Sequence, residues 1–146
     1  MKNLIEKLIN TDKDKATFII RFIVGYIFIM EGIQKFVYSD SLGVGRFIKI
    51  GIPYAEVMAP MVGVLELIFG LFILIGFVTR ISSIPQIIIM LVALSTTKLY
   101  LIAEKGLLTF SHEARNDLLM LFGLIFLLVK GSGAISIDQY LMKERK

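Results

Sequence analysis

The chain has 146 residues, of which 56% are hydrophobic, and a formal net charge of +4. Because its mean hydropathy of +0.79 is too high for a small soluble domain, we expect residues 1–146 to form a single integral membrane domain. The absence of cysteine excludes disulfides, thiolate metal sites and dithiol redox chemistry within this chain. The basic residues stand at the ends of apolar runs, which is typical of topology and lipid-headgroup charges and argues against nucleic acid as a partner.

The first twelve residues predict an amphipathic N-terminal segment that lies on the membrane surface. Four apolar side chains share one helical face there: Leu4, Ile5, Leu8 and Ile9. The alternative is a cleaved signal peptide, but Arg21 and Glu31 interrupt its apolar core and no small-x-small cleavage site follows.

Four apolar runs predict four spans, over residues 17–37, 57–77, 84–103 and 117–130. The fold class is therefore all-α, a membrane-embedded four-helix bundle. The last run is short, and we expect the long stem of Lys130 to extend it to the interface. Pro85 is expected in the first turn of the third span. The bias of lysine and arginine favours both termini in the cytoplasm. We expect the membrane to be a bacterial or archaeal cytoplasmic membrane.

Glu66 stands in the middle of the second span, where an ionised carboxylate costs several kcal/mol. It therefore needs a partner. Helical spacing places Ala59, Gly63 and Gly70 on its face, and small residues let helix backbones approach closely in lipid. Glu66 should face the interior of the bundle.

The first span carries a stripe of polar and small residues within about a third of the helix circumference. Its members are Arg21, Gly25, Glu31, Gly32 and Lys35. Glu31 precedes Lys35 by four residues, the favourable order for an ion pair within a helix. The inward face of the third span is expected to carry Gln86, Met90, Ala93, Thr97 and Tyr100.

Polar residues of all four spans reach one depth, between the bilayer midplane and the outer interface, at a rise of about 1.5 Å per residue. They predict a polar intramembrane pocket formed by Glu31, Lys35, Glu66, Thr97 and Asp117. Arg21 lies near the cytoplasmic interface, where it could reach lipid phosphates. His112 is the only histidine, so no metal site is expected. The alternative for the charged residues is a purely structural role in helix register and packing.

The chain resembles the DoxX family of small four-helix membrane proteins from Arg21 to the C-terminus. The first span contributes Arg21, Gly25, Gly32 and Lys35 to the resemblance. The most specific run comprises Glu66, Gly70, Gly76, Thr79 and Arg80, and the segment from Gly131 to Asp138 closes the pattern.

The resemblance implies a small subunit or accessory of a quinone-linked membrane oxidoreductase or redox-homeostasis system. Quinone would then be a ligand, with no cofactor resident in this chain. The partners would be membrane lipids and other membrane or peripheral subunits, or a second copy of the chain. Two alternatives stay open: a non-catalytic assembly or trafficking helper, and a small proton-coupled transporter. The sequence does not decide whether the chain is itself catalytic.

Overall fold

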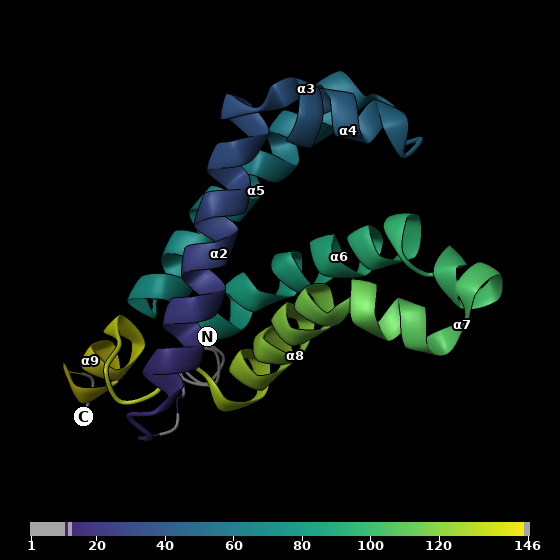
Figure 1. Ribbon diagram of the computed structural model, residues 1–146. Helices are drawn as coiled ribbons and strands as arrows, with labels where there is room; N and C mark the ends of the chain where they lie inside the picture. Colours follow the sequence, from purple (N-terminus) through teal and green to yellow (C-terminus); the bar gives the residue numbers. More distant parts are fainter. Residues whose placement is uncertain (1–10, 12, 145–146) are drawn as a thin grey trace.

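The computed structural model describes residues 11 and 13–144, and these form helices without any strand (Figure 1). The all-α fold class is therefore confirmed. Apart from Thr11, the amphipathic segment predicted over residues 1–12 lies outside the described residues. The helices are α2 (Thr17–Val37), α3 (Ser39–Leu42), α4 (Val44–Lys49), α5 (Ala55–Ile75), α6 (Thr79–Thr97), α7 (Tyr100–Glu113), α8 (Arg115–Lys130) and α9 (Ile137–Glu144).

Among the described residues, three helices are long and apolar enough to cross a membrane: α2, α5 and α6. Helix α8 has 16 residues, about 24 Å, and is short as expected. The four helices form two antiparallel pairs, α2 with α5 and α6 with α8, which diverge from a common end (Figure 1). We call this the terminal end, since α2 begins there and α9 lies there. The two diverging tips, one with α3 and α4 and the other with α7, are together called the loop end (Figure 1).

Helices α2 and α5 approach so closely that their backbones touch. A Cβ atom on Gly25 would lie 2.8 Å from the carbonyl oxygen of Gly70, and one on Gly32 would lie 2.8 Å from that of Gly63. No larger residue fits at these positions without moving a backbone. The stripes of small residues on the two helices are thus the surfaces along which the helices meet.

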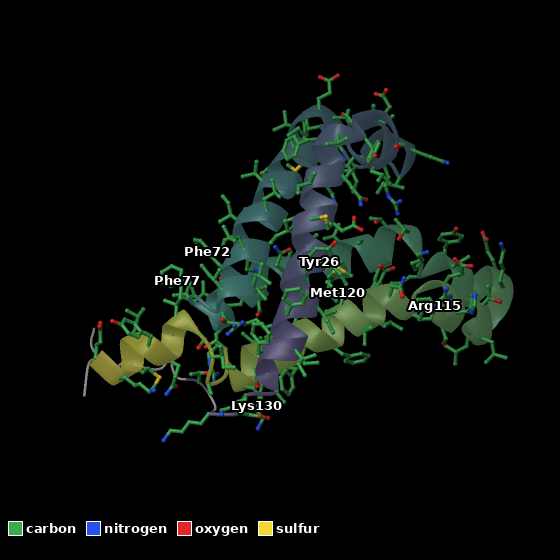
Figure 2. The ribbon with its side chains drawn as sticks, turned by 60° about the vertical axis from the view of Figure 1, so that its left-hand side comes forward. Tyr26, Phe72, Phe77, Arg115, Met120 and Lys130 are labelled. Carbon is green, nitrogen blue, oxygen red and sulfur yellow. The ribbon has the colours of Figure 1, made fainter. Side chains whose placement is uncertain are left out.

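The apolar core lies where the two helix pairs join. Phe28 of α2 and Ile73 of α5 pack there with Leu124 of α8, all three nearly or fully buried. Figure 2 shows Met120 of the same core midway along α8, between Arg115 at the loop end and Lys130 at the terminal end. The other faces of the helices expose large apolar side chains, which in a membrane protein face lipid.

Helix α6 differs from the predicted third span. It begins at Thr79 rather than at residue 84, so Pro85 lies inside the helix and not in its first turn. The helix also ends earlier, at Thr97. Lys98 and Leu99 form a turn, and residues 100–103, predicted to continue the span, belong to α7. Within α7, Gly106 breaks the helical geometry with φ 80° and ψ 168°.

The early start of α6 is explained by Asp138 of α9. Its carboxylate accepts hydrogen bonds from the backbone N–H groups of Val78, at 2.7 Å, and Thr79, at 3.1 Å. These are orphan donors of a helix N-terminus, and the carboxylate satisfies them as an N-cap would. Burial raises the pKa of Asp138 above its ordinary value, while the two backbone hydrogen bonds oppose that shift. Asp138 lies 60 residues after Val78 in the chain. The residues near Thr79 therefore contain no pattern that indicates this cap.

Arg21 is buried at the same end and does not reach lipid phosphates, so that expectation is wrong. Its guanidinium donates hydrogen bonds to three carbonyl oxygens: Leu74 of α5 at 3.2 Å, Ser132 at 2.7 Å and Ile135 at 2.6 Å. The last two belong to the loop between α8 and α9, which folds over the arginine. Arg21 therefore joins α2, the end of α5 and the C-terminal loop. We call Arg21, Asp138 and their hydrogen-bond partners the terminal knot.

Gly25→Ala should lower the free energy of unfolding by about 1–3 kcal/mol, because the new methyl group meets the α5 backbone. Reversible unfolding of the purified protein in mixed micelles measures this change. Val37→Ile, which adds a methylene at a position 64% exposed on the same helix, is the control and should change stability little. Equal stability of the alanine variant and the wild type would show that the backbones do not touch.

Asp138→Ala should cost about 1–3 kcal/mol of stability, since it leaves the N–H groups at the start of α6 without their acceptor. The same unfolding measurement applies. Asp40→Ala, which removes an exposed carboxylate from the first turn of α3, is the matched control. If both variants lose the same stability, the cap on α6 is not the cause.

Candidate functional site

Lys35 of α2 and Glu66 of α5 form an ion pair between the two helices. The ammonium nitrogen of Lys35 lies 2.7 Å from Oε2 and 2.9 Å from Oε1 of Glu66. Both side chains are shielded, with exposed fractions of 11% for Lys35 and 4% for Glu66. The glycine contact brings them together, because Gly32 and Gly63 each stand three residues before one member of the pair. The costly carboxylate thus has a partner.

Glu31 is the third member of this charged group. Its Oε2 atom lies 3.8 Å from Nζ of Lys35, and its side chain is 53% exposed. The predicted pairing within α2 is therefore present but secondary, because Lys35 sits much closer to Glu66. Glu31 connects the shielded pair with the surface of the bundle.

Gln86 joins α6 to α5 at the level of Glu66. Its Nε2 atom donates to the backbone carbonyl oxygens of Leu65, at 3.2 Å, and Glu66, at 3.4 Å. The side chain is fully buried, and its Oε1 atom has no hydrogen-bond partner among the described residues. The sequence predicts Gln86 on the inward face of its helix but assigns it no role. An amide in the middle of an apolar helix is the signal that could have assigned one.

Asp117 interacts electrostatically with Glu31 of the charged group, whereas Thr97 forms a hydrogen bond within its own helix. Asp117 is half-buried at the start of α8 and lies within electrostatic range of Glu31, Lys98 and Arg46. Thr97 donates its hydroxyl to the carbonyl oxygen of Ala93 in its own helix, at 2.6 Å. Of the five predicted pocket residues, the structure brings Glu31, Lys35 and Glu66 into contact and leaves Asp117 within electrostatic range of Glu31. It gives Thr97 a partner within its own helix.

The loop end carries further charges beyond Asp117. Lys98 lies 3.7 Å from Glu113 of α7, and Arg46 of α4 approaches Asp117 from the other helix pair. Charges of both signs therefore gather at the loop end, and of these Asp117 interacts with Glu31.

A surface hollow of about 470 Å³ lies elsewhere at the loop end, between the end of α4 and the start of α5. Tyr54 and Val57 are among its lining residues, and none of the five predicted pocket residues lines it. Within residues 11 and 13–144, no three histidine, cysteine or acidic residues lie close enough together to hold a metal ion.

The three apolar helices and the shielded ion pair between two of them define a small integral membrane protein with charged residues inside its helix bundle. Residues 16–99 match the DoxX family model, which covers more than half of the chain. The chain belongs to the DoxX family. The matched region contains Arg21, Lys35, Glu66 and Arg80, whereas α7 to α9 lie beyond it.

Three curated relatives are similar over nearly the whole chain. "Uncharacterized membrane protein Rv3486" of Mycobacterium tuberculosis is 43% identical over 143 residues, covering 94% of this chain and 88% of the relative. "Putative oxidoreductase CatD" of Bacillus subtilis is 29% identical, covering 94% and 95%. A Haemophilus influenzae protein without an assigned activity is 28% identical, covering 92% and 98%. No solved structure shows a significant match to the chain.

Lys35→Met should destabilise the protein by about 3–5 kcal/mol, because it leaves the Glu66 carboxylate buried without its cation. The double variant Lys35→Met, Glu66→Leu should recover most of that loss, since no buried charge remains. Unfolding in mixed micelles measures both. Lys98→Met is the control: its ion pair is longer and more exposed, so the cost should stay below about 1 kcal/mol. A double variant no more stable than the single one would contradict a direct interaction of Lys35 with Glu66.

Proposed function

We propose that this protein is a small membrane subunit or accessory of a quinone-linked oxidoreductase system, and that Lys35 and Glu66 hold the quinone headgroup. The observation that carries the proposal is the shielded ion pair between two membrane-length helices. Ionisable residues within membrane spans are costly and commonly mark ligand or proton pathways. The relative named as an oxidoreductase supports the same class of function.

The pair offers the two groups that a quinone headgroup requires. An ammonium group donates hydrogen bonds to a quinone carbonyl oxygen, and a carboxylate accepts one from the hydroxyl of the reduced form. Lys35 already donates to Glu66, so a bound headgroup would insert beside this hydrogen bond or replace part of it. The chain has no cysteine, and we assign the transfer of electrons to a partner with flavin or thiol chemistry.

The headgroup would reach the pair from the side of Glu31. That carboxylate is half exposed, whereas toward the terminal end the neighbouring side chains Phe28 and Ile73 are buried in the apolar core. We place the loop end on the outer side of the membrane and both termini in the cytoplasm, in keeping with the distribution of lysine and arginine. The site would then lie in the outer half of the bilayer.

A second candidate is a non-catalytic assembly helper, in which the ion pair serves only to join α2 to α5. Both oxygens of Glu66 already lie within 3 Å of the lysine nitrogen, which favours this role as well. In this case the charges set the helix packing, and the protein acts through a partner that binds its exposed faces. Quinone binding separates the two candidates.

The full chain in phospholipid nanodiscs should bind a short-chain benzoquinone or naphthoquinone saturably, as measured by equilibrium titration. The double variant Lys35→Gln, Glu66→Gln keeps a hydrogen-bonded pair without charge, and its affinity should fall about tenfold or more, because hydrogen bonds to charged groups are the stronger ones. Lys98→Gln, at the loop end but outside the pair, is the matched control and should bind like the wild type.

Two results would overturn the quinone proposal. One is wild-type binding no greater than that of empty nanodiscs with both probes. The other is equal affinity in the wild type and the uncharged double variant. Either result would leave the assembly role, which predicts a loss of stability or of partner binding in the same variant.

A further inference from the structure

Glu31 is the exposed member of a group whose other members are shielded. Its side chain is 53% exposed, against 11% for Lys35 and 4% for Glu66. It stands one helical turn before Lys35 on α2, and the lysine nitrogen lies 3.8 Å from its carboxylate. An exposed carboxylate thus adjoins a shielded ion pair through a single ammonium group.

The charged groups that face Glu31 come from three helices. Lys35 faces it from its own helix, Glu66 from α5 and Asp117 from α8. Lys98 and Arg46 lie beyond Asp117 and interact with it. Ionisable groups therefore continue from the shielded pair toward the loop end.

The opposite direction is closed by apolar packing. Toward the terminal end, Phe28 of α2 is 2% exposed and Ile73 of α5 is fully buried. Between them the α2 backbone touches α5 at Gly25 and Gly70. Among the described residues, Glu31 is the only carboxylate besides Glu66 within 4 Å of the Lys35 nitrogen, and it is the exposed one of the two.

We propose that Glu31 exchanges protons between the Lys35–Glu66 pair and the loop-end side of the membrane. This role rests on the proposed function for its purpose, since a quinone that is reduced or oxidised at the pair must take up or release protons. In the outward direction, a protonated Glu66 gives its proton to Lys35 while Lys35 gives one to the Glu31 carboxylate. Glu31 then releases that proton to water.

The net result is the transfer of one proton from Glu66 to Glu31. No electron moves, and Lys35 is an ammonium group both before and after the transfer. The 3.8 Å separation exceeds a direct hydrogen bond. A rotation of the exposed Glu31 side chain closes the gap, and a single bridging water would serve equally well. Glu31 is free to make this rotation, because its side chain is half exposed and its contact with Lys35 is long.

The test follows hydrogen–deuterium exchange at the Lys35 ammonium group. The full chain, labelled with nitrogen-15 at the lysine side chains, is placed in nanodiscs, and its Lys35 resonance is assigned by its loss in Lys35→Arg. Glu31→Gln should slow exchange about tenfold or more, within the range by which a positioned acid or base accelerates proton transfer. Glu31→Asp should keep most of the wild-type rate. Glu113→Gln, which removes another exposed carboxylate of the loop end, is the control and should leave the rate unchanged.

Each outcome decides a separate point. Wild-type exchange in Glu31→Gln would overturn the proton route, as would equal slowing in Glu31→Gln and Glu113→Gln. Slow exchange in Glu31→Gln alone supports the route even if the wild type binds no quinone, and in that case the quinone proposal fails by itself. Glu31→Asp guards against a folding defect, because slowing in both Glu31 variants without any loss of stability would rule out the carboxylate as the exchanging group.

Discussion

The contact of α2 with α5 through glycine is the constraint on which the site depends. At Gly25–Gly70 and Gly32–Gly63 nothing larger than hydrogen separates the two backbones. Lys35 stands one turn from the second contact toward the loop end, and Glu66 stands one turn from it toward the terminal end. The long lysine side chain spans the contact and meets the carboxylate at 2.7 Å. Had the helices been held apart by leucine or isoleucine, a carboxylate at position 66 would lack a cation. The close packing of small residues thus gives the buried carboxylate a cation, and this interaction offsets part of the cost of burying the charge.

A buried ion pair is weak evidence of stability, because desolvation of both charges can exceed their attraction. Two well-packed apolar side chains could join α2 to α5 at least as well. That the chain instead keeps Lys35 and Glu66, adds Glu31 at 3.8 Å and sets the amide of Gln86 against the Glu66 backbone favours a chemical role for the group. These polar groups come from three helices, so a change in helix packing would alter their geometry together.

Much of the fold could be predicted from the sequence, because apolar length and helical spacing act locally. The inward face of α5, with Ala59, Gly63, Glu66 and Gly70, is buried as its periodicity indicates. The errors arose where distant segments decide the outcome. Helix α6 begins at Thr79 because Asp138 caps it, and Arg21 turns inward because the loop after α8 supplies carbonyl oxygens. The predicted depth of Thr97 assumed a helix that continues to residue 103, whereas α6 ends at Thr97 itself. For Lys35 and Glu66, the sequence indicates a common depth in the membrane and a position facing the bundle interior. It does not indicate that the two side chains form an ion pair.

The terminal knot also bears on how the chain assembles in the membrane. Arg21 belongs to the first membrane-length helix, yet two of its three acceptors belong to residues 132 and 135. During synthesis from the N-terminus, α2 enters the bilayer long before those carbonyls exist. The guanidinium must stay hydrated among lipid headgroups in the interval, which its position in the first turns of α2 allows. Only when the segment after α8 arrives can Arg21 leave water, and the same segment brings Asp138 to the start of α6. Residues 132–138 would therefore complete the packing of α2, and a chain that stops before them would leave an arginine and a helix end unsatisfied.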